Sequence, residues 1–297
     1  MRYSLRQIEV FLEVARRESV SLAAKELAMS QSAVSEALAD LESQFEVQLF
    51  DRRGRRLQLN GLGSALRSRA ESLYAQAHEL EQAFAMRAEI GLLRVGATLS
   101  IGNYLTAPLM ARFMREHPGT RVTLDVANTE EIERKVLNFE IDVGLVEGEV
   151  QAPELTVTRW CDDELVVFCA PDHPYAKKRE LSDQDLLEAP WIVRERGSGT
   201  RQAFEHAMHG ILPELNLVLE LQHTEAIKSA VRAGLGLGCV SRIALAEAFR
   251  HKGLIPCRVP QRDFRRGFFF VQHKHKYQSA GIKAWLELCK SQAQKSA

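Results

Sequence analysis

Apolar residues in the first part of the chain recur every three or four positions, which is the period of amphipathic helices. The pattern predicts one helix over residues 4–17 and a second over 22–28, for which Ser21 is the expected N-cap. After a turn at 29–31, a third helix is predicted over 32–44. Its buried side is expected to consist of Val34, Leu38, Leu41 and Phe45.

The opposite side of this third helix carries mostly short side chains, whereas a helix side that meets only water is usually dominated by lysine and glutamate. Its members are Ser32, Ser35, Glu36 and Ala39. Short side chains permit close approach to another surface. We therefore expect this side of the helix to lie against a partner molecule.

Two short stretches that alternate apolar and polar residues follow, at 47–50 and 56–59. They predict a two-stranded β-ribbon with Gly54 in its turn. The tip of the ribbon carries four arginines, namely Arg52, Arg53, Arg55 and Arg56. Residues 1–60 hold nine Lys and Arg against nine Asp and Glu, so a neutral segment concentrates cationic charge at this tip, where it can contact phosphate.

A long helix is predicted over residues 61–89, because the segment contains no proline and, after Gly63, no glycine. Its apolar residues repeat at alternating spacings of four and three, which is typical of a coiled-coil seam. They are Leu66, Ala70, Leu73, Ala77, Leu80 and Phe84. Polar residues occupy most other positions, which favours pairing with a second copy over packing against the same chain.

Beyond Gly91 the pattern alternates between strands and helices, which predicts an α/β domain with a mainly parallel sheet. Strands are expected at 92–97, 121–126, 143–146, 164–169, 191–193, 217–221, 237–240 and 268–271. Helices are expected to begin at Asn103, Glu130, Thr200 and Glu225, and a last helix to end at Lys290. If the last strand and helix return to the first set, crossings near Cys161 and Gly267 join two lobes. These lobes would comprise 91–161 with 268–297, and 162–267. A cleft between them can close on a small ligand.

Composition places the chain among ordinary globular proteins. It has 297 residues, with 39 Lys and Arg against 39 Asp and Glu, which suggests about two folded units. No apolar run approaches the roughly 20 residues of a membrane span, and polar residues interrupt the first twenty positions, so a cytoplasmic protein is expected. The five cysteines are odd in number and widely spaced, which predicts reduced thiols in the core.

Helix, turn, helix and basic ribbon together predict a winged helix-turn-helix, whose third helix enters the major groove while the wing grips the backbone. The stretches that carry a family likeness are LRQIEVF at 5–11, AA at 23–24, SQSAVS at 30–35, LE at 41–42 and LFDR at 49–52. With them the chain resembles the LysR-type transcriptional regulators over its whole length. Two positions depart from the family pattern, since Glu46 stands where glycine is usual and Asn60 where threonine commonly caps the long helix.

The resemblance implies a DNA-binding domain at 1–60, a dimerising linker helix at 61–90 and an effector domain at 91–297, two-lobed like periplasmic solute-binding proteins. Implied partners are promoter DNA, RNA polymerase, a small effector and further copies of the chain in a dimer of dimers. The implied DNA contacts are Gln31, Ser32, Ser35, Glu36, Arg52, Arg53, Arg55 and Arg56. Glutamine can read an adenine edge and Glu36 can accept from a cytosine amine, while the arginines supply affinity more than sequence choice.

Two segments predict a site for a small anion. Residues 98–103 and 197–201 each bring hydroxyls and backbone amides to the start of a helix. Taken alone, Thr98 and Ser198 are better explained as ordinary helix caps. The family resemblance implies instead that both segments line the cleft, and the implied effector residues are Thr98, Ser100, Glu147, Ser198, Gly199, Thr200 and Thr224.

Glu147 would repel a fully ionised anion unless it keeps a proton or receives one from the ligand, which favours a protonated oxyanion. Residues 194–201 and 100–104 resemble the branch of the family associated with sulfur metabolism, whose effectors include sulfite. Arg194 and Arg201 can hold such a charge, or equally pair with Glu195 and Glu205 on the surface.

No catalytic, cofactor or metal site is expected. Glycines 234, 236 and 238 lack the spacing of a dinucleotide loop, and Ser198 lacks that of a nucleophile elbow. The pairs His206 with His209 and His273 with His275 are expected at the surface, without further ligands. The alternative is a ligand-binding protein or an enzyme on the same two-lobed fold whose N-terminal segment serves only to dimerise. Such a protein would have no use for an arginine-tipped wing.

Overall fold

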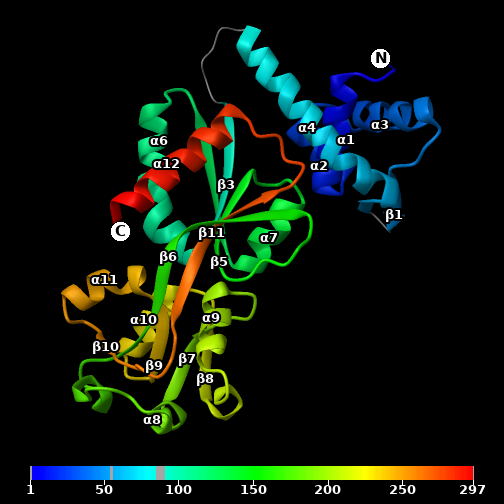
Figure 1. The fold of residues 1–297 in the computed structure, drawn as a ribbon. Coiled ribbons are helices and arrows are strands. Elements are labelled where there is room, and N and C mark those ends of the chain that lie inside the picture. The colour runs from blue at the N-terminus through cyan, green and yellow to red at the C-terminus, as the bar shows by residue number, and fades with distance from the viewer. Residues whose placement is uncertain (1, 54–55, 85–90, 297) are drawn as a thin grey trace.

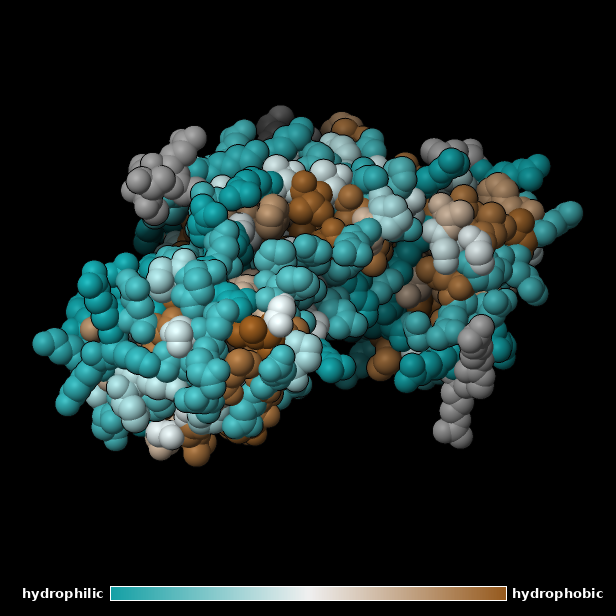
Figure 2. Space-filling model, turned by 60° about the horizontal axis from the view of Figure 1, so that its bottom comes forward, coloured by the Kyte–Doolittle hydropathy of each residue, from teal (hydrophilic) through white to brown (hydrophobic). Residues whose placement is uncertain are grey.

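The computed structural model describes residues 2–53, 56–84 and 91–296. A small helical unit at the N-terminal end is joined by one long helix to a larger α/β part with two lobes (Figure 1). The two lobes follow one another along a pair of shared strands. Hydrophilic residues cover most of the face shown in Figure 2, where hydrophobic residues form separate groups. Among the described residues, no helix is long and apolar enough to cross a membrane.

The predicted winged helix-turn-helix is present. Its elements are α1 (Leu5–Arg17), α2 (Val20–Glu26), α3 (Gln31–Phe45), β1 (Phe50–Arg53) and β2 (Arg56–Leu59). Serine caps begin the three helices, because a serine oxygen accepts from a free amide of the first turn. The caps are Ser4, Ser19 and Ser30. The prediction of Ser21 as a cap was wrong, because the second helix begins earlier and Ser21 lies inside its first turn.

The apolar residues of the three helices and the ribbon form one core. Val34, Leu38 and Leu41 are buried as predicted, but Phe45 is 43% exposed because α3 ends there and the side chain extends beyond the core. The first strand of the ribbon begins at Phe50 and pairs with Leu59, so the stretch 47–50 was placed too early. The predicted turn residue Gly54 lies outside the described residues.

Glu46 ends α3 in the left-handed conformation, with φ of 53°. Glycine adopts this conformation without a Cβ penalty, which explains physically why a glycine is usual at this position. Asn60 caps the next helix as predicted, because its Oδ1 accepts from the Gly63 amide at 2.8 Å.

The long helix is α4 (Gly61–Phe84), and its seam is divided between two environments. Leu66 and Ala70 pack into the core of the N-terminal helical unit. Leu80 and Phe84 are 56% and 79% exposed. The first part of the seam therefore packs against the same chain, contrary to the prediction for the whole helix, and the second part is open to a partner.

The α/β part contains one sheet with the strand order β4-β3-β5-β11-β6-β9-β7-β8, and β10 pairs with β6. The strands are β3 (Leu92–Thr98), β4 (Arg121–Ala127), β5 (Val143–Glu147), β6 (Leu155–Cys169), β7 (Pro190–Arg194), β8 (Asn216–Leu221), β9 (Leu237–Ser241), β10 (Ile255–Cys257) and β11 (Arg265–His273). Pairing is parallel around β3 and β7 and antiparallel along β6 and β11. The sheet is therefore mixed, and the prediction of a mainly parallel sheet holds only within each lobe.

Strands β6 and β11 connect the lobes. They pair from Leu155 opposite His273 to Glu164 opposite Arg265, and both pass from one lobe to the other (Figure 1). The predicted crossings near Cys161 and Gly267 both lie on this pair. We call the part with β3, β4 and β5 the first lobe and the part with β7, β8 and β9 the second lobe.

Helices cover both lobes. They are α5 (Leu99–Ile101), η1 (Gly102–Thr106), α6 (Ala107–Glu116), α7 (Thr129–Leu137) and α12 (Ala280–Ser296) in the first lobe, and η2 (Pro174–Lys177), α8 (Asp183–Glu188), α9 (Gly199–Ala207), η3 (Leu212–Glu214), α10 (Thr224–Arg232) and α11 (Arg242–Arg250) in the second. The first of them begins at Leu99, directly after β3, and not at Asn103 as predicted. The turn that follows it is a π-helix, a form often found at functional sites.

Candidate functional site

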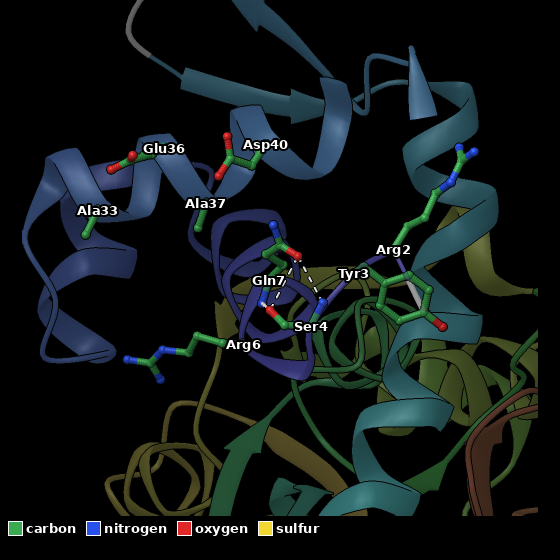
Figure 3. A pocket seen from close by; sticks show the side chains of 9 residues that line it. All are labelled: Arg2, Tyr3, Ser4, Arg6, Gln7, Ala33, Glu36, Ala37 and Asp40. Atoms are coloured by element: carbon green, nitrogen blue, oxygen red, sulfur yellow. Dashed lines mark hydrogen bonds between the residues drawn. The ribbon is translucent and has the colours of Figure 1, made fainter. Parts of the chain in front are cut away.

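The recognition helix α3 presents an exposed side between two grooves. Of the predicted DNA contacts, Gln31, Ser32, Ser35 and Glu36 are all exposed on this helix. One groove lies between α3 and the wing and includes Ser35, Ala39 and Arg52. The other groove lies between α3, which carries Glu36 and Asp40, and the start of α1, which carries Arg6 (Figure 3). A helix with a groove on each side can enter a wide channel such as the major groove.

Two wing arginines, Arg52 and Arg56, have side chains that are available for contact. Arg52 is exposed, and Arg56 has only a 3.8 Å ion pair with Glu18 at the surface. Arg53 pairs with Arg56 in the ribbon through its backbone. Arg55 lies outside the described residues.

The centre of the predicted effector cleft is Glu147, at the end of β5, with 1% of its surface exposed. Three hydroxyl groups from two lobes donate to its carboxylate. Thr98 at the end of β3 donates to Oε2, while Ser100 donates to Oε1 at 3.1 Å and Thr200 at 3.4 Å. Neither Thr98 nor Ser198 makes a side-chain cap bond, so the interpretation of the two residues as ordinary caps was wrong.

Arg266 completes this cluster, and sequence reasoning missed it. Its guanidinium donates to Asp163 at 2.7 Å, to Thr200 at 3.0 Å and to Ser100 at 3.5 Å, and lies 3.9 Å from the Glu147 carboxylate. The arginine is near the crossing at Gly267, on the strand that joins the lobes. The sequence places Arg265 and Arg266 just before Gly267, where the chain is expected to cross between the lobes. This position was the signal by which Arg266 could have been found.

Burial raises the pKa of Glu147 above the ordinary glutamate value, and the cations of Arg266 and Arg194 oppose that rise. The carboxylate therefore lies in a site where taking up a proton is easier than in water. The prediction that Glu147 can keep a proton is consistent with this environment.

Arg194 is a second buried cation near Glu147. Its Nε and Nη2 bind Glu195 at 2.7 and 2.8 Å, while its Nη1 is buried without a hydrogen-bond partner in the described part of the chain. Arg201 pairs with Glu205 at 2.6 Å. Both arginines thus form the ion pairs that the sequence analysis gave as the alternative to holding an anion. Both arginines are buried, however, and not at the surface.

The glycines of the segment 197–199 allow the two lobes to touch. A Cβ on Gly199 would lie 1.6 Å from the carbonyl oxygen of Glu147, and one on Gly197 would lie 2.5 Å from Glu130 Oε2. The Gly199 amide donates to Thr129 of the first lobe at 3.1 Å. This amide is consequently already used by the protein in the conformation described.

A further side-chain contact joins the two lobes. The Tyr104 hydroxyl of the first lobe donates to Glu225 of the second, and Lys228 binds the same carboxylate at 2.7 Å. Thr224 is buried beside Glu225, but no hydrogen bond joins its side chain to Glu147 among the described residues. The structure thus brings Thr98, Ser100 and Thr200 together around Glu147 and leaves Thr224 apart from them.

His273 is buried, contrary to the prediction that it lies at the surface. Its ring packs 4.2 Å from the Phe139 ring, centroid to centroid. Burial lowers the pKa of His273. The cysteines are free thiols as predicted, and four of the five are buried.

A winged helix-turn-helix that carries exposed short residues on α3, joined to a two-lobed domain with a polar cluster between its lobes, defines a ligand-responsive DNA-binding regulator. Comparisons with known proteins identify the family. Residues 5–64 match the bacterial regulatory helix-turn-helix of the LysR family, and residues 87–294 match the LysR substrate binding domain. The chain belongs to the LysR family of transcriptional regulators.

Relatives agree with this assignment. The chain is 41% identical to the transcriptional regulator YeiE of Escherichia coli (strain K12), over 97% of this chain and 98% of that one. It is 28% identical to the transcriptional regulator CysL of Bacillus subtilis (strain 168), over 89% of each. The regulatory domain of Synechocystis CcmR, solved in complex with 2-PG, is 27% identical, with a TM-score of 0.64 over 69% of this chain and 98% of that one. The expectation of a regulator, and not an enzyme, is confirmed by these relatives.

Proposed function

We propose that this regulator binds a small, singly protonated oxyanion in the cleft around Glu147, and that the bound anion changes how the winged helices bind a promoter. Arg266 and the unpartnered Nη1 of Arg194 supply positive charge, while Thr98, Ser100 and Thr200 supply hydroxyls. The proposed lining also includes Ser198, Gly199 and Thr224.

The observation that carries the proposal is the buried set of hydroxyls directed at one carboxylate. These hydroxyls already donate to Glu147. An effector that accepts hydrogen bonds from them instead leaves the carboxylate without donors, so it must bring a donor of its own or a proton for Glu147. A bisulfite-like ion carries both negative charge and a proton. Together with the resemblance to the sulfur-metabolism branch, this favours sulfite as the effector and sulfur metabolism as the regulated process.

For the DNA-binding half we propose contacts from Gln31, Ser32, Ser35 and Glu36 to bases and from Arg52, Arg53, Arg55 and Arg56 to phosphates. The exposed side of α3 and the exposed side chains of Arg52 and Arg56 support these assignments. The proposed division is 1–60 for DNA binding, 61–90 for the linker and 91–297 for the effector domain.

Assembly as a dimer of dimers, with contact to RNA polymerase, belongs to the same proposal. The exposed seam residues Leu80 and Phe84 support pairing of two linker helices. Replacing both by glutamate should lower the sedimenting mass to that of a smaller assembly. Glutamate at the neighbouring Gln76 should leave the mass unchanged, and equal masses for all three proteins would contradict the pairing.

The effector site is tested by thermal unfolding in a panel of small oxyanions that includes sulfite, sulfate and phosphate. A specific ligand raises the unfolding temperature in proportion to the logarithm of its concentration. The wild type should respond to a protonatable oxyanion, and Thr98→Val and Ser198→Ala should lose that response while keeping DNA affinity within a few-fold. A normal response in both variants would show that the cleft assignment is wrong.

A further inference from the structure

We infer that helix α7 transmits the state of the cleft to the DNA-binding domain, and that Arg67 of the linker helix is the positioning residue at its far end. This inference rests on the proposed function and adds the element that carries the signal. Helix α7 lies between α9 of the second lobe and the DNA-binding unit with α4 (Figure 1).

The first turn of α7 is fixed to the second lobe and to the cleft. Thr129 Oγ1 accepts from the Gly199 amide at 3.1 Å and donates to the Glu147 carbonyl at 2.8 Å. The Glu130 amide donates to the Gly197 carbonyl at 3.2 Å. A movement of the second lobe away from the first must break the bonds to Gly197 and Gly199 or move the start of α7.

The body of α7 can transmit such a movement because it is a short, well-packed rod. Its nine residues span about 13 Å at the helical rise. Ile132 and Val136 are buried in a core that includes Val146 and Val271 on the sheet beneath. Close-packed interiors resist continuous deformation, so the helix shifts as a unit.

The last turn of α7 is bound to the linker helix. The Arg67 guanidinium donates to the backbone oxygen of Asn138, the C-cap residue, and to its Oδ1 at 3.2 Å. The guanidinium carbon also lies 6.0 Å from the centre of the Phe139 ring. Arg67 is 8% exposed, and its Nε is buried without a hydrogen-bond partner among the described residues.

The part of α4 that carries Arg67 belongs structurally to the DNA-binding domain. Leu66 and Ala70 on either side pack into its core, and Glu71 pairs with Arg16 of α1 at 3.2 Å. A shift of Asn138 therefore acts on a helix that is rigidly attached to α1. Since energetic coupling between two sites is reciprocal, DNA binding must also alter the cleft.

A double-mutant cycle tests this coupling in the full-length protein without any effector. Thr129→Val keeps the shape of the side chain and removes both hydrogen bonds at the cleft. Arg67→Met keeps much of the length of the side chain and removes both hydrogen bonds to Asn138. Matched controls are Thr120→Val, a buried threonine whose Oγ1 has no partner in the described structure, and Arg69→Met, on the exposed side of the same helix.

The readout is the dissociation constant for a duplex from the region upstream of the protein's own gene, by fluorescence anisotropy. Thr129→Val should change this constant by about five-fold or more. In the Arg67→Met background the same substitution should change it by no more than about two-fold, and Arg67→Lys should restore part of the effect. Equal changes in both backgrounds, or equal changes from the controls, would overturn the inference.

A second readout separates this inference from the proposed function. If the wild-type protein binds the upstream duplex no more tightly than other DNA, the proposed function is refuted. Amide hydrogen exchange in residues 63–74 of α4 would still report the coupling in that case. Thr129→Val should raise exchange in this segment of the otherwise wild-type chain and leave it unchanged in the Arg67→Met chain. Unchanged exchange in both chains would refute the role of α7.

Discussion

Arg266 and Asp163 lie directly opposite each other on the two strands that join the lobes, and Nε of Arg266 donates to Asp163 Oδ2 at 2.7 Å. This ion pair fixes the guanidinium at the crossing, from where its other nitrogens reach Ser100 and Thr200. Arg266 thus belongs both to the polar cluster around Glu147 and to the strand pair that joins the lobes.

Arg266→Met should lower the free energy of unfolding by about 3–5 kcal/mol, because it leaves the buried carboxylates of Asp163 and Glu147 without their cation. Chemical denaturation measures the change. Arg265→Met is the matched control, since Arg265 is exposed and pairs with Asp263 at the surface, where solvent screens the ion pair and the expected loss is much smaller. Equal losses for the two variants would contradict the role assigned to Arg266.

Glu147→Gln should change how stability depends on pH. Burial raises the pKa of Glu147 in the folded chain above 4.5, so the contribution of this carboxyl to stability is fully present below pH 4.5 and is lost as pH rises through the folded value. The glutamine variant cannot lose a proton there. Its free energy of unfolding should rise relative to wild type with increasing pH, by up to about 1.4 kcal/mol per pH unit within that window. A difference between the two proteins that does not change with pH would count against the buried carboxyl.

Arg52→Gln and Arg56→Gln should weaken binding to every DNA sequence, because phosphate contacts carry no sequence information. The slope of log affinity against log salt concentration should fall by about one for each arginine that contacts a phosphate. Fluorescence titrations at several salt concentrations measure both quantities. Gln31→Ala offers a contrast, since it should reduce discrimination between sequences and leave the salt slope nearly unchanged. A change of sequence preference in the wing variants would be inconsistent with this division of roles.

Glu46→Gly should stabilise the chain by roughly 1 kcal/mol, because the residue occupies a left-handed conformation that penalises a Cβ. Thermal or chemical unfolding of the two proteins gives the difference. Glu36→Gly, in the interior of the same helix, should destabilise by about the same amount, since glycine is a poor helix former. If Glu46→Gly also destabilised the chain, the turn would not be strained as described.

Elements with a strong local signal could be predicted from the sequence. The three N-terminal helices, the ribbon and most strands of the α/β part lie where apolar periodicity placed them, with ends that shifted by a few residues. Strand β6 begins much earlier than predicted, at Leu155 instead of residue 164, and β10 was not predicted. Thr98, Ser100 and Thr200 were assigned to one site from family resemblance, and their hydroxyls do meet at Glu147.

Features that depend on tertiary contacts could not be predicted locally. In the sequence, Arg266 lies in a polar stretch with no distinguishing pattern. It joins the polar cluster around Glu147 only because its strand is buried between the two lobes. The sequence suggested that Gly197 and Gly199 turn backbone amides toward a ligand. In the structure, their lack of a Cβ leaves the space that the Glu130 side chain and the Glu147 backbone occupy. The exposure of Phe45 likewise depends on where the core ends.

The affinity of the wild-type protein for its own upstream duplex, compared with a scrambled duplex and repeated with each oxyanion of the panel, tests the central claim most directly. We expect the upstream duplex to bind at least about 1,000-fold more tightly than the scrambled one, and one protonatable oxyanion to shift that affinity about five-fold or more. Equal binding of both duplexes, or an affinity that no oxyanion changes, would contradict a regulator controlled by an anion in the cleft.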